Sequence, residues 1–354
     1  RYTGLSRTAI GNIIDDLIQE GMVQEDEHRV GADRRTISLS FNATAGYVLG
    51  GSLGRNHLTI LLSDLVGTPI QRSDLPFSTV EGSTKGVPRL IQAINTFITQ
   101  QQIERKKLLG IGLGIVGTLD PSLQRTTVPT PFAGWAGVHL QKALEDTLGI
   151  PVYLDNDGNM GASGESHYGS GRNERNMLYV KVGSGIAGGL ILNHQIYRGS
   201  IGTAGEIGHI PVDFNGTLCH CGHYGCLETV AGTRGILTEA QRLFPTVTTI
   251  SQVIEAARYG EPAALHALER AGKYLGFALS SLVNTLNPAL IVLDGSTMQA
   301  KDLVLRPLLS SLEAHSLQVP FSHTRVVLAE RSGLAIPLGG IATVLDTVFG
   351  SRSA

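Results

Sequence analysis

The chain has 354 residues, a formal net charge of −2, 44 glycines and three cysteines. Its length is sufficient for two or three domains with their own cores, and its near-neutral charge gives no global electrostatic support for binding to nucleic acid or to a membrane surface. No apolar run is long enough to span a membrane and no signal peptide is apparent, so we expect no membrane insertion and a cytoplasmic location.

Residues 1–42 differ in pattern from the rest of the chain. Residues 5–21 are predicted to form one amphipathic helix, with Ser6 as its N-cap and Gly21 just after its C-terminal end. Its apolar stripe consists of Ile10, Ile13, Ile14, Leu17 and Ile18. Another face carries small or hydrogen-bonding side chains, which is typical of a recognition helix that reads base edges in the DNA major groove: Arg7, Thr8, Gly11 and Asn12.

Two short strands are predicted after this helix, at residues 22–24 and 36–39. The turn between them carries Arg29, Arg34 and Arg35. A helix followed by a two-stranded ribbon with a basic tip favours a winged helix that binds DNA. The candidate DNA contacts are therefore Ser6, Arg7, Thr8, Asn12, Arg34 and Arg35.

The alternative for this segment is a helical hairpin used for dimerisation. Residues 1–40 contain five arginines and seven acidic residues, and this balance of −2 is unfavourable for phosphate contacts. Because the sequence begins at Arg1 without a methionine, inside what reads as an interrupted motif, further residues are expected upstream, and they could change this balance.

From Tyr47 onward, strands alternate with helices, which indicates an α/β fold. Strands are predicted at residues 47–54, 58–62, 108–117, 152–154, 177–182, 190–192 and 325–328, and a strand with its following loop at 289–296. Helices are predicted at 90–102, 138–148, 158–168, 228–244, 249–259, 262–287, 301–314 and 337–348.

Three polar residues, Asp155, Asn156 and Asp157, follow the strand at 152–154. Ligands of open α/β sheets bind at the carboxyl ends of strands, so these side chains could orient sugar hydroxyls, or one aspartate could act as a general base. The alternative is an Asx-turn that caps the helix at 158–168.

A glycine-rich turn at residues 183–189 connects two apolar strands. Its backbone N–H groups could hold a phosphate, although neither the dinucleotide-binding nor the P-loop pattern is present. The alternative is a tight hairpin that needs glycine on steric grounds.

All three cysteines, Cys219, Cys221 and Cys226, fall within eight residues, and His209 precedes the first of them by ten residues. Three cysteines and one histidine form a complete tetrahedral set for Zn²⁺, and an odd number of cysteines cannot all pair in disulfides. Such a zinc is structural, because four protein ligands leave no open position for water. The alternative is a set of ordinary buried thiols beside a core histidine.

Two neighbouring histidines, His220 and His223, compete with His209 as the fourth ligand. Glu206 and Glu228 flank the cluster, and a structural metal does not account for either of them. These two carboxylates are therefore candidates for ligand binding.

Four motifs in this order match a known family: Leu154-Asp155-Asn156-Asp157, the turn at 183–189, Gly205-Glu206-Ile207-Gly208-His209, and the cysteine cluster through Glu228. From about Tyr47 to Phe349 the chain resembles the ROK family (repressors, open reading frames and kinases), and residues 1–42 resemble the winged helix-turn-helix of its repressor branch. The resemblance implies an α/β, actin-like (ribonuclease H-like) sugar-kinase fold of two lobes around a cleft, preceded here by a truncated winged helix-turn-helix.

The domain division that follows has three parts: the DNA-binding segment at 1–42, a first lobe at 43–160 with the C-terminal helix at 335–354, and a second lobe with the zinc loop at 161–334. The resemblance also implies sugar contacts from Asn156, Asp157, Glu206, His209 and Glu228, with Asp157 at the position of the kinases' catalytic base. His209 could bind a sugar hydroxyl through one ring nitrogen while the metal holds the other.

The chain departs from the kinases at the phosphate-binding turn. The kinases have an acidic residue followed by Gly-Gly-Thr, whereas this chain has Ser52-Leu53-Gly54-Arg55-Asn56. Loss of the carboxylate removes an orienting group for Mg²⁺ or phosphate, and an arginine obstructs close approach of a phosphate to the backbone. Pro131-Phe132 also replaces the asparagine that often precedes Trp135, so one family sugar contact has no counterpart.

The sequence therefore predicts a sugar-responsive transcriptional repressor, and not an enzyme, that binds operator DNA as a dimer or tetramer and contains structural zinc. The alternative function is an ATP-dependent sugar kinase with Asp157 as its base. A third possibility is that the effector is a protein, such as a sugar-transport component.

Overall fold

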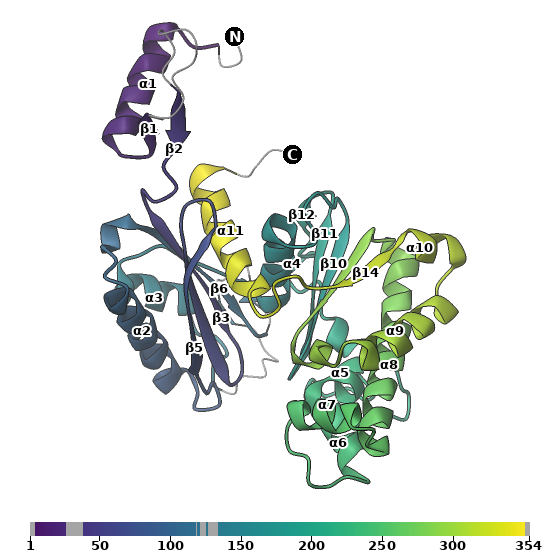
Figure 1. Cartoon of the computed structure of the whole chain (residues 1–354). Coiled ribbons are helices and arrows are strands. Elements are labelled where there is room, and N and C mark those ends of the chain that lie inside the picture. Colours follow the sequence, from purple (N-terminus) through teal and green to yellow (C-terminus); the bar gives the residue numbers. More distant parts are fainter. Residues whose placement is uncertain (1–3, 26–37, 118, 121–124, 127–133, 351–354) are drawn as a thin grey trace.

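The computed structural model of the protein describes residues 4–25, 38–117, 119–120, 125–126 and 134–350. Two five-stranded sheets form the centres of two lobes, and helices α4 (Asp157–Tyr168) and α11 (Ala335–Phe349) lie between them (Figure 1). A small helix–strand unit at the N-terminus stands beyond the end of the first lobe. None of the described helices has the length and apolar character needed to cross a membrane.

The sheet of the first lobe has the strand order β5-β4-β3-β6-β9. Its strands are β3 (Tyr47–Leu53), β4 (His57–Ser63), β5 (Pro69–Pro76), β6 (Leu108–Ile115) and β9 (Val152–Asn156). Strands β3, β6 and β9 are parallel, whereas β4 pairs antiparallel with both β3 and β5. Helices α2 (Ser83–Gln100) and α3 (Leu140–Leu148) share one hydrophobic core with one face of this sheet, and α11 packs on the other face.

Helix α11 also packs directly on the backbone of this sheet, which brings the two unusually close. A Cβ atom added to Gly50 of β3 would collide with the carbonyl of Pro337, and one added to Gly112 of β6 would collide with the carbonyl of Gly340. The glycines of these apolar strands are therefore required by the close approach of α11.

The sheet of the second lobe has the strand order β12-β11-β10-β13-β14. Its strands are β10 (Met177–Val182), β11 (Ile186–Leu192), β12 (Gln195–Ile196), β13 (Leu290–Asp294) and β14 (Arg325–Leu328). One face packs on the helices α5 (Leu227–Ala231), α6 (Thr233–Gln241), α7 (Ile250–Arg258), α8 (Pro262–Leu286) and α9 (Asp302–His315). The other face packs on α4, so α4 and α11 form the layer that the two lobes share.

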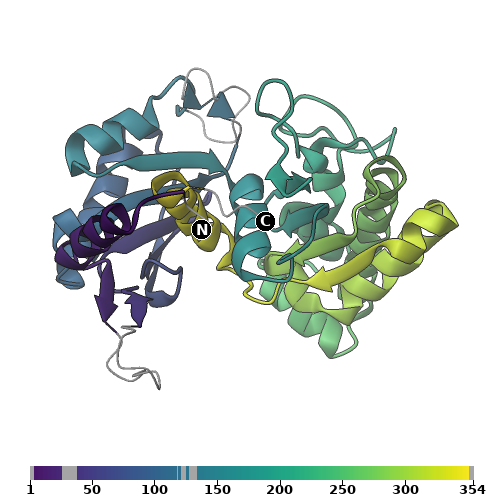
Figure 2. The same cartoon turned by 90° about the horizontal axis from the view of Figure 1, so that it is seen from above.

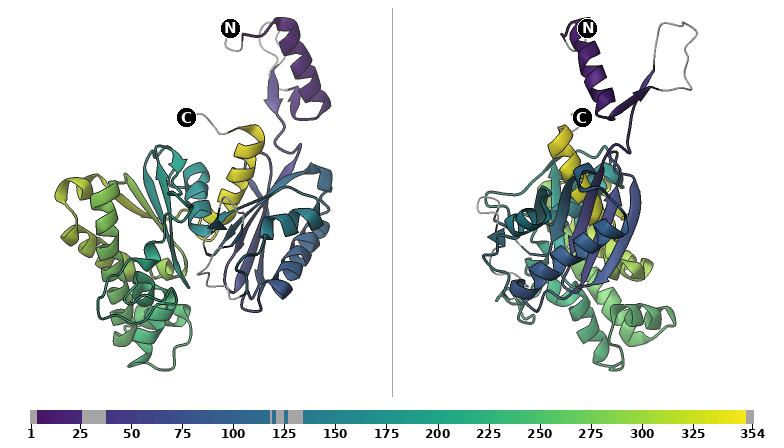
Figure 3. Two further views of the ribbon diagram at one scale, coloured as in Figure 1. Left: turned by 180° about the vertical axis from the view of Figure 1, so that it is seen from behind. Right: turned by 90° about the vertical axis from the view of Figure 1, so that its left-hand side faces the viewer.

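The N-terminal unit consists of α1 (Arg7–Gln19) and an antiparallel pair of short strands, β1 (Val23–Glu25) and β2 (Leu39–Phe41). Seen from above, the unit lies in front of the first lobe (Figure 2). It stands away from both lobes, with the end of α11 near its base (Figure 3). Contacts at that base include an edge-to-face pair of Phe41 and Phe349, whose ring centroids lie 6.3 Å apart, and the packing of Met22 against the core beneath α11.

Most predicted elements are confirmed, and four predictions need correction. The single helix predicted at 228–244 is two helices, α5 and α6, because Gly232 is extended between them. Helix α2 begins at Ser83, not near Leu90, and includes Pro88 within its first two turns. The second strand of the N-terminal ribbon lies at Leu39–Phe41, two or three residues later than predicted.

The fourth correction concerns the glycine-rich turn. Only residues 183–185 form the turn, and residues 186–189 belong to strand β11. In addition, the sequence did not predict β5 or the short helix α10 (Gln318–His323).

Candidate functional site

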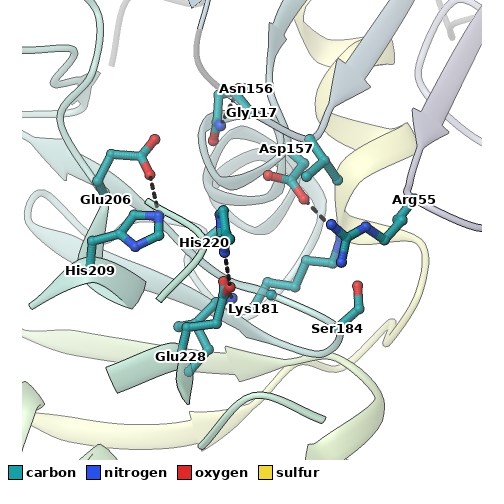
Figure 4. Close-up of a pocket in the computed structure, with 14 residues that line it drawn as sticks. Arg55, Gly117, Asn156, Asp157, Lys181, Ser184, Glu206, His209, His220 and Glu228 are labelled. Atoms are coloured by element: carbon teal, nitrogen blue, oxygen red, sulfur yellow. Dashed lines mark hydrogen bonds and ion pairs between the residues drawn. The ribbon is translucent and has the colours of Figure 1, made fainter. Parts of the chain in front are cut away.

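All five residues predicted to contact a sugar line one pocket between the lobes: Asn156, Asp157, Glu206, His209 and Glu228. Asn156 ends β9 and Asp157 begins α4, so both lie where the first sheet meets the central helix layer. Glu206 and His209 come from the segment after β12, and Glu228 is the second residue of α5 (Figure 4).

Asn156 has a structural role as well as a place in the pocket. Its side-chain oxygen accepts a hydrogen bond from the N–H of Gly158 at 2.7 Å, which caps α4. Its side-chain amide donates to the carbonyl of Gly117 at 2.8 Å. The Asx-turn considered for this segment is thus present, and it holds Asn156 at the pocket wall.

Asp157 is almost fully buried, with 3 % of its surface exposed, and it forms an ion pair that the sequence analysis missed. The ammonium of Lys181, in strand β10, donates to Asp157 Oδ2 at 2.8 Å. The sequence contained a signal for this residue, because Lys181 interrupts an apolar strand between the fully buried Val180 and Val182.

Asp155, at the same strand end, is occupied by neighbouring groups. The guanidinium of Arg198 donates to Asp155 Oδ2 at 2.7 Å, and the side-chain amide of Asn159 donates to Asp155 Oδ1 at 2.8 Å. Asp155 therefore anchors the start of α4 and does not line the pocket.

Glu206 and Glu228 bring two more carboxylates to the pocket. Burial raises the pKa of Glu206 to about 7, and the negative charges of Asp157 and Glu228 add to this effect. A carboxyl group with this pKa can donate a hydrogen bond in its protonated form and accept one in its ionised form. Glu228 accepts from the N–H of Ile186 at 3.0 Å, and its other oxygen lies 3.1 Å from His220 Nδ1.

His209 lies between the pocket and the cysteine cluster. Its Nε2 atom faces the carboxylate of Glu206 at 3.8 Å, while its Nδ1 atom lies 3.6 Å from Cys219 Sγ. Burial lowers the pKa of His209 below its usual value, with further lowering from His220 and His223, which favours the neutral imidazole that a metal requires.

The cysteine cluster has the geometry of a zinc site. The ligand atoms of His209, Cys219, Cys221 and Cys226 all lie within 4.8 Å of one another, and the thiols of Cys221 and Cys226 are 3.6 Å apart. Zinc bonds of about 2.3 Å to sulfur and about 2.0–2.1 Å to nitrogen in a tetrahedron separate ligand atoms by roughly 3.6–3.8 Å. The residues present therefore fit zinc.

The two rival histidines lie close to single cysteines. His220 Nδ1 is 3.7 Å from Cys219 Sγ, and His223 Nδ1 is 3.7 Å from Cys221 Sγ. Among the described residues, however, His209 is the histidine that groups with all three cysteines, whereas His220 groups with Cys219 and Glu228.

A second cavity of about 540 Å³ lies beside the pocket, and Lys181, Arg55 and Ser184 line both. Ser52 and Arg55, from the altered phosphate-binding turn, line this cavity together with Gly183 of the glycine turn. Of the two explanations for the glycines, the steric one applies to Gly189, where an added Cβ would collide with the carbonyl of Gly158. Gly183 has no such collision, since the atom nearest to its added Cβ is Ser296 Oγ at 3.6 Å, an ordinary contact distance.

The candidate DNA contacts on α1 are exposed. The side-chain oxygen of Ser6 accepts from the N–H of Ala9 at 3.1 Å and caps the helix, while Arg7, Thr8 and Asn12 lie on its solvent-facing surface. Arg34 and Arg35 lie outside the described residues, as do Pro131 and Phe132.

The chain is similar to a family model and to known proteins of two kinds, repressors and sugar kinases. A family model described as the ROK family matches residues 48–346. A xylose repressor of Bacillus subtilis (strain 168) is 33% identical over 350 residues, which cover 98% of this chain and 89% of that protein. A glucokinase of Halalkalibacterium halodurans is 32% identical over 77% of this chain and 86% of its own length.

Among solved structures, a ROK family transcriptional regulator described as a homologue of the E. coli MLC protein matches with a TM-score of 0.83 and 25% identity. The match covers 98% of this chain and 90% of that chain. It confirms the expected two-lobed α/β fold with an N-terminal helical unit.

Proposed function

Because the chain belongs to the ROK family and resembles its transcriptional repressors over nearly its whole length, we propose that it is a transcriptional repressor that releases operator DNA in response to a sugar. One observation carries this proposal: the same chain holds an exposed N-terminal helix unit and an interlobe pocket rich in carboxylates. Carboxylates accept hydrogen bonds from adjacent sugar hydroxyls, and an exposed helix can enter a DNA groove.

The effector in this proposal is a neutral sugar bound by Asn156, Asp157, Glu206, His209 and Glu228. The names of the relatives support D-xylose as the first sugar to test. The zinc is structural and is held by His209, Cys219, Cys221 and Cys226, so that His209 serves both the metal and the sugar.

The proposed DNA contacts are Ser6, Arg7, Thr8, Asn12, Arg34 and Arg35. Two copies of the N-terminal unit would read two half-sites, so the proposal includes a homodimer or a tetramer of this chain, acting in the cytoplasm. We retain the division into residues 1–42, 43–160 with 335–354, and 161–334 as part of this proposal.

Helix α11 is the proposed connection between the pocket and the N-terminal unit. Ile336, near its start, lines the second cavity, and its neighbour α4 begins with Asp157 of the sugar pocket. Phe349, its last residue, contacts Phe41 of the N-terminal unit. A sugar that changes the position of α4 can thereby change the position of the DNA-binding helices.

The test uses DNA fragments selected by the full-length protein from a random pool. Their affinity is measured by fluorescence anisotropy at one fixed salt concentration, with and without D-xylose and a panel of other sugars. At least one sugar should weaken DNA binding, and the Glu206→Gln variant should lose this response while it keeps its zinc. The matched control is Glu104→Gln, since Glu104 lies on the surface away from the pocket. If no sugar changes DNA affinity or the melting temperature, sugar sensing is refuted.

The second candidate function is an ATP-dependent sugar kinase, which the similarity to a glucokinase favours. Ser52 and Arg55 at the altered turn count against it. ADP release from MgATP with a panel of hexoses and pentoses discriminates the two functions. Turnover that disappears in the Asp157→Asn variant would establish the kinase instead. A response to a sugar-transport protein, in place of a free sugar, is tested in the same DNA-binding assay.

A further inference from the structure

Lys181 occupies an unusual position for a lysine. It lies in the interior strand β10, where Val180 and Val182 are fully buried against the helices of the second lobe. Lys181 is on the opposite face, the one that packs on α4, and only 19% of its side chain is exposed. A lysine buried to this degree requires a partner for its charge, and that partner is Asp157.

The charges of the pocket explain why this ion pair matters. Asp157, Glu206 and Glu228 line one small pocket, so their negative charges repel one another. Lys181 supplies positive charge in direct contact with the most buried of these three carboxylates. The ion pair therefore allows three acidic side chains to gather around one ligand.

The ion pair also defines what Asp157 can do to a ligand. A carboxylate accepts at both oxygens, and Lys181 uses Oδ2. Asp157 can still accept a hydrogen bond from a sugar hydroxyl, while the ammonium of Lys181 at 2.8 Å fixes the position of its carboxylate. Lys181 also lines both cavities, so it lies between the sugar pocket and the space beyond it.

We propose that Lys181 is a positioning and specificity-determining residue of the effector site. It holds Asp157 as a hydrogen-bond acceptor for a neutral sugar and separates the sugar from the second cavity. This inference rests on the proposed sugar-sensing function, and it assigns a role to a residue outside the predicted set of contacts.

The experiment compares the wild type with Lys181→Met, Asp157→Asn and the double variant. Methionine keeps most of the apolar stem of lysine and removes its charge. Binding of D-xylose and of the other sugars that bind the wild type is measured by calorimetry, and stability without sugar by urea unfolding. Lys142→Met is the matched control, because Lys142 is a surface lysine paired with Asp146 far from the pocket.

Lys181→Met should weaken sugar binding by about 10-fold or more, the usual effect of a lost hydrogen bond to a charged group. The double variant should bind sugar about as well as Asp157→Asn alone, since Lys181 acts through Asp157. Lys142→Met should bind as the wild type does. If Lys181→Met does not fold, the double variant, which lacks both charges, takes its place in the comparison with Asp157→Asn.

Two results overturn the proposal: unchanged sugar affinity in folded Lys181→Met, or losses from the two single substitutions that add in the double variant. A purely structural role would lower the urea midpoint and leave sugar affinity unchanged. If the wild type binds no sugar, the proposed function fails and the sensing role of Lys181 fails with it. The unfolding measurements without sugar still decide whether Lys181 and Asp157 are energetically coupled.

Discussion

The identity of the fourth zinc ligand can be decided by a pair of histidine substitutions. His209 Nδ1 and His220 Nδ1 lie at nearly equal distances from Cys219 Sγ, 3.6 Å and 3.7 Å. The two histidines differ in their distance from the other cysteines, because the ligand atoms of Cys221 and Cys226 form a group with His209 and not with His220. We therefore expect His209→Ala to weaken zinc binding strongly and His220→Ala to affect it little.

The magnitude follows from the energy of structural zinc sites. Zinc binding to four such ligands is worth about 10–16 kcal/mol, so an equal share for one ligand is roughly 2.5–4 kcal/mol. At about 1.4 kcal/mol per factor of ten, His209→Ala should weaken zinc binding by roughly 60- to 700-fold. His220 contacts Glu228 and Cys219 from outside the four-residue group, so its loss should change zinc affinity by about 10-fold, the lower end of the range for such neighbours.

The assay titrates each purified variant with a chromogenic zinc chelator and measures metal content by mass spectrometry. The wild type should contain one zinc per chain, and His209→Ala should lose it at a chelator concentration that leaves zinc in the wild type and in His220→Ala. The assignment is wrong if His220→Ala loses zinc first, or if the two variants lose it together. A wild type that contains no zinc after purification and binds none would refute the metal site itself.

Three further predictions concern helix α11, its packing on the first sheet, and the pocket. Phe349→Ala should leave sugar affinity and melting temperature nearly unchanged, because both Phe349 and its partner Phe41 are about half exposed. The same substitution should reduce the sugar-dependent release of DNA, measured in anisotropy titrations. Gly112→Ala should lower the free energy of unfolding by at least about 2 kcal/mol in urea titrations, because its Cβ would collide with α11. Gly11→Ala, in open space on α1, should be neutral or stabilising by up to about 1 kcal/mol. Asp157→Asn should weaken sugar binding in calorimetry while its zinc content stays at the wild-type level, and an unchanged affinity would remove Asp157 from the site.

The cysteine cluster was predictable because its signal is local: three cysteines within eight residues retain their meaning without knowledge of the fold. The grouping of the pocket residues was predicted from the resemblance to a family, since only Asn156 and Asp157 of these five follow a strand. By contrast, the pairing of Lys181 with Asp157 depends on the packing of α4 against β10, and the contact of Phe41 with Phe349 joins the two ends of the chain. Neither has a local sequence signal for its partner.

Two errors in secondary structure have identifiable physical causes. Strand β5 is an edge strand with a mostly polar, exposed sequence, so it lacks the apolar alternation that predicts a half-buried strand. The break between α5 and α6 falls at a single residue, Gly232, and the helical pattern continues on both sides of it. In that position a Cβ atom would lie 2.6 Å from the carbonyl oxygen of Glu228, so the local turn at the end of α5 favours glycine.

The packing of α11 explains how a small change in the pocket can reach the N-terminal unit. At Gly50, Gly112 and Gly164, the carbonyls of α11 lie against the bare backbone of β3, β6 and α4, with no side chains between them. Such contacts cannot adapt by changing rotamers, so a shift of α4 must be met by movement of α11 as a rigid body. Because Phe349 at the far end of α11 contacts Phe41, a movement of α11 displaces the residues that join the N-terminal unit to the first lobe. If Phe41→Ala and Phe349→Ala both leave the sugar response of DNA binding unchanged, the signal takes another route and this mechanism is wrong.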